Sequence, residues 1–80
     1  MDTSTKATYD YLKDKYSRII LSKKELAIEL NIAPSTLDLY ISKGIGVPKY
    51  KRASDAKNAR LLFNIYDIAV YLNSGQIETM

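Results

Sequence analysis

Signals for the start and end of two neighbouring helices constrain the fold of this chain more than any other feature. Ser22 and Glu25 match the pattern of a capping box, in which the serine side chain can accept from the Glu25 N–H and the glutamate side chain from the Ser22 N–H. Asn31 suits the left-handed conformation that often ends a helix, and Pro34 suits the first turn of a new one. The sequence therefore predicts one helix that starts after Ser22 and stops near Asn31, and another that starts at Pro34 and stops at Gly44.

The apolar residues of these two helices follow the spacing of a helix-turn-helix. Ala27 lies four positions before Asn31, and Leu37 and Tyr40 follow ten and thirteen positions after Ala27. A helix-turn-helix needs a small residue where its helices cross, a left-handed turn, and apolar residues that hold the second helix steeply, so that its outer face is free for a DNA major groove. An ordinary helical hairpin with the same core residues is the alternative interpretation.

The same kinds of pattern predict the remaining elements. Apolar residues at spacings of three and four predict an N-terminal amphipathic helix over residues 3–18 and a last helix over 65–72. Residues 49–52 and 60–64 are predicted to form the two strands of a β-hairpin with a long, basic tip. The apolar run 19–21 is too short to assign from its period. The expected fold is therefore mainly α, with three to four helices and a small β-hairpin.

Positive charge is concentrated in one stretch of the chain. The whole sequence of 80 residues has 12 Lys and Arg against 9 Asp and Glu, a net charge of +3. Residues 43–60 alone hold six basic residues and one acidic residue, whereas residues 61–80 hold no basic residue and two acidic ones. Such a local excess is typical of a face that binds a polyanion, and a solvated lysine-rich loop is the other interpretation.

The absence of cysteine and histidine narrows the chemistry that this chain can perform. It excludes disulfides, zinc sites built from these residues, and catalysis that uses a thiolate or an imidazole. We therefore expect no enzyme activity, no catalytic residues, no cofactor and no metal. The sequence also has no apolar run long enough for a membrane span and no signal peptide, so we expect a cytoplasmic, nucleoid-associated protein.

A resemblance to a known family lies in four stretches of the chain, namely residues 21–27, 31–37, 43–50 and 65–72. In these stretches the chain resembles excisionases and AlpA-like small DNA-binding proteins, whose winged-helix fold is related to that of the MerR group. The resemblance implies a winged helix-turn-helix over residues 21–75. Residues 1–20 would then be a helix that braces this domain or takes part in dimerisation, and residues 76–80 a frayed tail.

The resemblance implies double-stranded DNA as the partner, with the helix after Pro34 in the major groove and the hairpin as a wing on the backbone or in the minor groove. The candidate contacts of this recognition helix are Ser35, Thr36, Asp38 and Leu39. Those of the wing are Lys49, Lys51, Arg52, Lys57, Asn58 and Arg60. Because side chains alternate along a strand, Lys49 and Lys51 share one face. We favour these two and Lys57 as DNA contacts, with a structural role as the alternative for the two arginines.

The recognition helix departs from the family pattern at two places. Ala33 stands where members commonly have a hydroxyl residue, so a capping hydrogen bond worth about 1 kcal/mol is missing. Asp38 and Leu39 stand where many members have Arg or Lys, and phosphate would repel Asp38, although its carboxylate can accept from a cytosine amino group. A plain solvated helix surface is therefore the alternative for these positions.

Two functions compete on this reasoning. The first is a DNA-binding excision factor or transcription regulator, with a recombinase or neighbouring copies of the protein on DNA as its further partners. The second is a protein-interaction module, for example a phage-encoded inhibitor, that keeps the winged-helix fold and binds its partner through Asp38 and Leu39.

Overall fold

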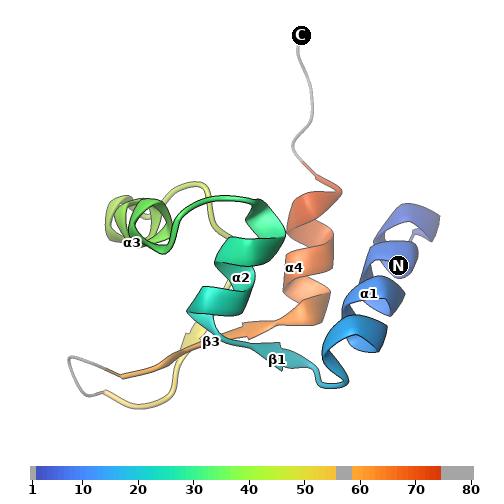
Figure 1. Cartoon of the computed structure of the whole chain (residues 1–80), viewed down its shortest axis with the longest axis horizontal. Coiled ribbons are helices and arrows are strands. Elements are labelled where there is room, and N and C mark those ends of the chain that lie inside the picture. Colours follow the sequence, from blue (N-terminus) through green and yellow to red (C-terminus); the bar gives the residue numbers. More distant parts are fainter. Residues whose placement is uncertain (1, 56–58, 75–80) are drawn as a thin grey trace, which may run out of the picture.

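The computed structural model describes residues 2–55 and 59–74, and the elements given below belong to this part of the chain. It contains four helices and three short strands (Figure 1), which are α1 (Thr3–Tyr16), β1 (Ile20–Leu21), α2 (Lys23–Leu30), α3 (Pro34–Lys43), β2 (Lys51–Arg52), β3 (Leu61–Asn64) and α4 (Ile65–Leu72). The expectation of a mainly helical chain with a small β element is confirmed. The β element is larger than expected, because it has a third strand.

The predicted boundaries of α2 and α3 are confirmed by their caps. The Ser22 hydroxyl accepts from the Glu25 N–H at 3.1 Å, and the Glu25 carboxylate accepts from the Ser22 N–H at 2.9 Å, which completes the capping box. Asn31 ends α2 with a left-handed φ of 58°, and Gly44 ends α3 with a φ of 72°. Ala33 caps α3 without a side-chain hydrogen bond, as its missing hydroxyl predicts.

Helix α1 is two residues shorter than predicted. At its start the Asp2 carboxylate accepts from the Thr5 N–H at 2.9 Å, and at its end Ser17 adopts a left-handed φ of 56°. Ile19 continues the apolar spacing of this helix in the sequence, but it lies outside the helix with 49% of its surface exposed. Its carbonyl instead accepts from the Ile65 N–H at 2.8 Å, next to the sheet.

The sheet is antiparallel, with β3 in the centre between β1 and β2. The predicted hairpin forms, because β2 pairs with the first half of β3 and places Lys51 opposite Leu62. The unassigned run 19–21 supplies β1, which pairs with the second half of β3 and places Leu21 opposite Phe63. A strand of two residues has no period of its own in the sequence, so only its pairing with β3 identifies it.

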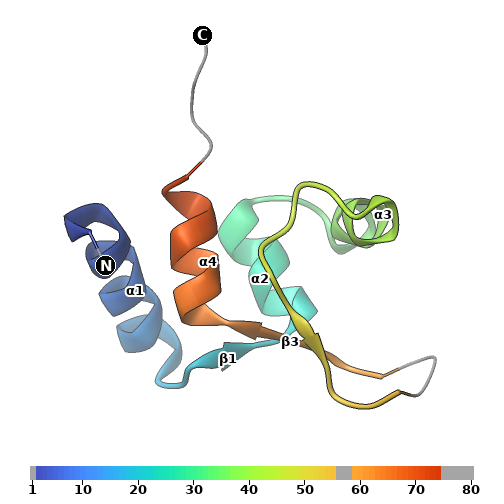
Figure 2. The same cartoon turned by 180° about the vertical axis from the view of Figure 1, so that it is seen from behind.

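One hydrophobic core joins the four helices to the sheet. Its buried side chains are Leu12, Leu21, Leu26, Ala27, Leu37, Phe63, Ile65 and Ile68. Helix α1 lies beside α4 (Figure 2) and contributes Leu12 to this core. Asn73 Nδ2, at the end of α4, also donates to Thr8 Oγ1 of α1 at 2.9 Å. The N-terminal helix therefore shares its core with the rest of the chain, while the tail expected at 76–80 lies outside the described residues.

Helix α3 and the hairpin project from one end of the molecule, and α1 lies at the other end (Figures 1 and 2). The linker between α3 and β2 first passes close to α3 and then reaches α4, where Val47 and Pro48 line a groove with Tyr66 and Val70. Gly46 has a left-handed φ of 72°, and a Cβ at this position would lie 3.3 Å from the Tyr40 ring. Pro48 is buried in the same linker. Within residues 2–55 and 59–74, no helix is both long and apolar enough to cross a membrane.

Candidate nucleic-acid interface

The outer face of α3 follows from the way this helix is buried. Leu37 is fully buried, and Ile41 is partly buried against the same core. Since side chains three and four positions apart share a helix face, the opposite face carries Ser35, Leu39 and Ser42, which are all exposed. Two of these three are predicted contacts. Ser42 is an addition that the sequence analysis missed, although its spacing from the other two could have identified it.

The other two predicted residues of α3 lie beside this face. Thr36 is half-buried. Asp38 lies on the side toward α2, where Lys23 Nζ is 2.5 Å from Asp38 Oδ1. From the sequence, Asp38 is expected to be a bare carboxylate that phosphate would repel, but in the structure its charge is paired with that of Lys23. The two partners are 15 positions apart, so no local pattern indicates the pair.

The hairpin carries cations that have no acidic partner in the described part of the chain. Its four described basic side chains are all exposed, namely Lys49, Lys51, Arg52 and Arg60. None of the four forms an ion pair or a side-chain hydrogen bond with another described residue. Tyr50 behaves differently, because its ring lies 5.4 Å from the Phe63 ring at the edge of the core. Tyr50 therefore faces the core, whereas Lys49 and Lys51 are exposed, as strand alternation predicts. Arg52 is predicted to share the face of Tyr50, but it is exposed at the end of β2.

The remaining wing residues are placed only in part. Lys57 and Asn58, the other two predicted contacts, lie outside the described residues. Arg60, for which a structural role is the alternative, has no acidic partner among the described residues. Arg60 instead borders a hollow of about 300 Å³ together with Lys23 and Lys24. Because Lys23 is paired with Asp38, the hollow adds Lys24 at the start of α2 to the cationic surface. Lys24 is distant from the hairpin in the chain, so no local pattern predicts this contribution.

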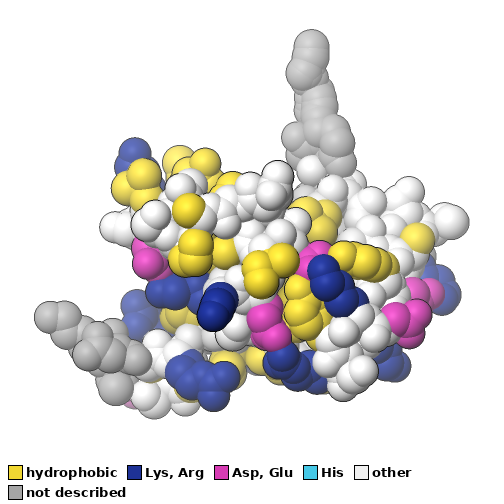
Figure 3. Space-filling model, viewed as in Figure 1, with side chains coloured by type: hydrophobic (Ala, Val, Ile, Leu, Met, Phe, Trp, Pro, Cys, Tyr) yellow, Lys and Arg dark blue, Asp and Glu magenta, His cyan; other side chains and the backbone are white. Residues whose placement is uncertain are grey.

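Ion pairs are confined to the first half of the chain as described here. The four pairs are Lys6–Asp10, Lys15–Glu29, Arg18–Glu25 and Lys23–Asp38. Beyond residue 38, the described Lys and Arg side chains have no such partner. Figure 3 shows basic side chains next to the grey hairpin tip at the lower left, whereas basic and acidic side chains are mixed toward α1 at the right.

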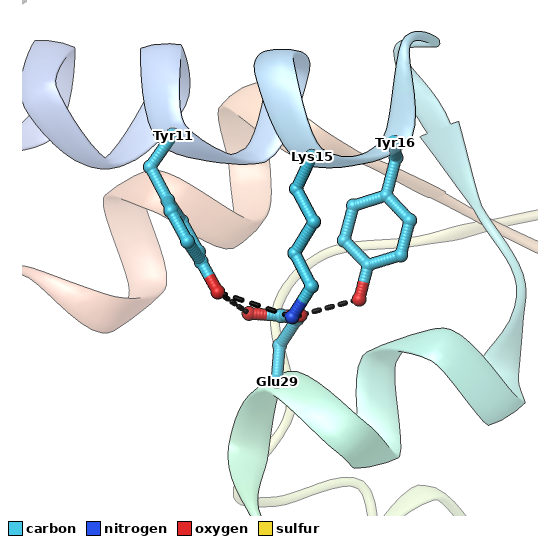
Figure 4. Close-up of polar contacts among 4 residues, drawn as sticks. All are labelled: Tyr11, Lys15, Tyr16 and Glu29. Atoms are coloured by element: carbon cyan, nitrogen blue, oxygen red, sulfur yellow. Dashed lines mark hydrogen bonds and ion pairs between the residues drawn. The ribbon is translucent and has the colours of Figure 1, made fainter.

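One of these pairs belongs to a cluster that joins α1 to α2 (Figure 4). Glu29 of α2 accepts from Tyr11 Oη at 3.1 Å, from Lys15 Nζ at 2.7 Å, and from Tyr16 Oη. Lys15 Nζ also donates to Tyr11 Oη at 3.1 Å and lies within 5.5 Å of the centroids of both tyrosine rings. Only 6% of the Glu29 side chain is exposed, so its charge depends on these three donors.

The protonation states of this cluster follow from its contacts. Burial acts to raise the pKa of Glu29, but the hydrogen bonds from Lys15 and the tyrosines outweigh it and hold this pKa below 4.5. The hydrogen bonds to Glu29 and Tyr11 raise the pKa of Lys15. Burial, together with the hydrogen bond to Glu29, raises the pKa of Tyr16 to about 12. Near neutral pH the cluster is therefore a compensated charge pair that holds two helices together.

In comparisons with protein-family models, curated proteins and solved structures, nothing matches this chain. The two parts of the candidate interface are the exposed face of α3 and the cations of the hairpin, which lie at the same end of the molecule (Figure 1).

Proposed function

We propose that this protein binds double-stranded DNA through a winged helix-turn-helix, with α3 in the major groove and the hairpin on the backbone or in the minor groove. One observation carries the proposal. The exposed face of α3 lies at one end of the molecule together with four exposed hairpin cations, which have no acidic partner among the described residues. Such cations are available to phosphates at once, whereas a paired cation must first give up an existing contact.

The connection between α2 and α3 supports the proposal. Asn31 makes the left-handed turn, and the N–H of the next residue, Ile32, donates to the Ala27 carbonyl at 3.1 Å. Ala27 itself is 1% exposed and lies in the same core cluster as Leu37 of α3. In Figure 1 α3 is seen end-on and α2 from the side, so the two helices cross steeply. A helix-turn-helix requires these features.

Within this class we propose the role of an excision factor or a small transcription regulator, without catalysis, as the resemblance to excisionases and AlpA-like proteins implies. A recombinase, or neighbouring copies of the protein on DNA, are the partners that such a role adds. Both roles require the same contacts from this chain. The difference between them lies in where the DNA sites are, so the positions of the sites in the genome distinguish the two roles.

The salt dependence of binding tests the proposal. Gel-shift titrations of a random-sequence duplex pool at about 50 and 200 mM salt give the affinity at each concentration. If three to five cations contact phosphates, the logarithm of the affinity should fall against the logarithm of the salt concentration with a slope of about −3 to −5. No binding at the lower salt concentration, or an affinity that does not change with salt, contradicts the proposal.

A protein-interaction role is the second candidate, because two apolar features favour it. Leu39, in the middle of the outer face of α3, is 51% exposed. A groove of about 300 Å³ also runs along α4, and its apolar lining is Val47, Pro48, Tyr66, Val70 and Tyr71. This role predicts no salt-dependent binding of duplex DNA, so the same titration separates the two candidates.

A further inference from the structure

Asp38 is the one acidic residue of α3, and it lies next to the surface that would face DNA. It flanks the outer face of Ser35, Leu39 and Ser42. Its Oδ1 atom is 2.5 Å from the Nζ atom of Lys23, which is the first residue of α2. A charge pair thus connects the two helices of the proposed helix-turn-helix at the edge of its DNA-binding surface.

This ion pair is not expected to contribute much to the stability of the fold. The exposed fractions of the two side chains are 42% for Lys23 and 56% for Asp38, so both charges are largely in water. Ion pairs of this kind contribute little to the free energy of unfolding. The pair matters more for DNA binding, because a bare carboxylate repels an approaching phosphate and a compensated carboxylate does not.

We propose that Lys23 is a positioning residue for DNA binding, which compensates the charge of Asp38 and holds its carboxylate at the side of α3. The outer face of α3 then stays neutral and open to DNA. The inference rests on the DNA-binding function proposed above. In this role Lys23 acts through Asp38, so the loss of Lys23 is most harmful while Asp38 is charged.

Lys24 provides a matched control. It is the next residue of α2, it is exposed, and it has no ion pair with a described residue. Lys23→Met and Lys24→Met each remove one positive charge from the start of α2, and both weaken the general attraction to DNA. Only Lys23→Met also leaves Asp38 without its partner.

The experiment compares the wild type, Lys23→Met and Lys24→Met, each with and without Asp38→Asn. Fluorescence anisotropy at low salt gives the Kd of each protein for a random-sequence duplex pool. Asp38→Asn raises the net charge by one in every background, so the effect of net charge on Kd is the same in all three. Any additional gain in affinity in the Lys23→Met background therefore measures the contribution of the Lys23–Asp38 pair. We expect Asp38→Asn to improve affinity about threefold to fivefold more in the Lys23→Met background than in the other two.

Equal effects of Asp38→Asn in the three backgrounds overturn the inference, while DNA binding by the wild type still supports the proposed function. No binding by the wild type instead overturns the proposed function, and the inference with it. Lys23→Arg keeps the cation and should bind DNA as the wild type does. Lys24 and Asp38 are exposed and Lys23 is half-buried in a solvent-accessible ion pair, so all variants should keep a melting temperature close to that of the wild type. Measured melting temperatures then distinguish a change in Kd from a loss of folding.

Discussion

The two ends of the molecule use their charges in different ways. At the end formed by α1 and α2, most basic side chains pair with carboxylates, Lys13 and Lys24 being the exceptions among the described residues, and Glu29 is almost fully buried among its donors. At the end formed by α3 and the hairpin, the described Lys and Arg side chains are exposed and have no acidic partner. The net charge of +3 does not distinguish the two ends. The difference teaches that the position of uncompensated charge indicates a binding face better than the total charge does.

If the α1–α2 end holds the fold together, the largest effect on stability should come from its core. Leu12 is the fully buried residue of α1. We expect Leu12→Ala to lower the free energy of unfolding by about 2–5 kcal/mol, because it removes buried methyl groups and leaves a cavity. Urea denaturation measures this change. A loss below about 1 kcal/mol would show that α1 is peripheral and that the two ends do not differ in this respect.

The boundary between the two ends lies where α2 meets α3. Ala27 is buried there in the core cluster that also contains Leu37 of α3, and protein cores are closely packed. We expect Ala27→Leu to cost about 1–3 kcal/mol through overpacking, measured as a lower melting temperature. An unchanged melting temperature would mean that Ala27 does not lie between the two helices.

The charge cluster at the α1–α2 end should give a smaller effect that depends on pH. Glu29→Gln replaces a buried carboxylate that has three donors, which should cost about 1–2 kcal/mol near neutral pH. The folded-state pKa of Glu29 lies below 4.5, so the stabilisation by its charge is fully present above pH 4.5 and is lost as the pH falls through the lower value.

The wild type and the Glu29→Gln variant should therefore become equally stable in acid. Urea denaturation of both proteins over a pH series measures the convergence. A stability difference that stays constant throughout the acid range would contradict a role for the charge of Glu29 in holding α1 on α2.

The smallest effect on stability is expected at the other end. Lys51→Ala should change the free energy of unfolding by less than about 0.5 kcal/mol, because the side chain is exposed and unpaired among the described residues. It should nevertheless weaken DNA binding and make the salt slope shallower by about one, as the loss of one phosphate contact requires.

Lys13 is the matched control for this prediction. It is exposed on α1, at the opposite end of the molecule, and it too has no ion pair with a described residue. Lys13→Ala removes the same charge and should leave the salt slope unchanged. If both variants reduce the slope equally, the two ends do not differ in their contact with DNA.

Local signals were sufficient to predict the helices around the turn. A capping box, a left-handed asparagine, a proline at the first helical position and a glycine stop each act within a few residues, and they mark α2 and α3 correctly. The end of α1 was predicted wrongly because apolar spacing continues to Ile19, while the backbone at Ser17 is already left-handed. Strand β1 could not be predicted at all, because its identity depends on a partner more than forty positions away.

The candidate site was predictable to the extent that it depends on period and composition. The outer face of α3 follows from its spacing, and the basic hairpin follows from the charge excess in residues 43–60. The pairing of charges depends on tertiary contacts and has no local sequence signal. Thus the sequence alone does not show that Asp38 is compensated by Lys23, or that the hairpin cations lack such partners within residues 2–55 and 59–74.

The edge strands of the sheet affect the solubility of the protein. An unpaired strand edge is a template for association between molecules. In this protein β1 covers one side of β3 with only two residues, and on the other side β2 presents Lys51 and Arg52. Charged side chains, lysine above all, discourage an edge strand from pairing with another chain. The cations proposed to contact DNA therefore also protect the sheet from aggregation, and replacing them with apolar residues would lower solubility whether or not DNA is present.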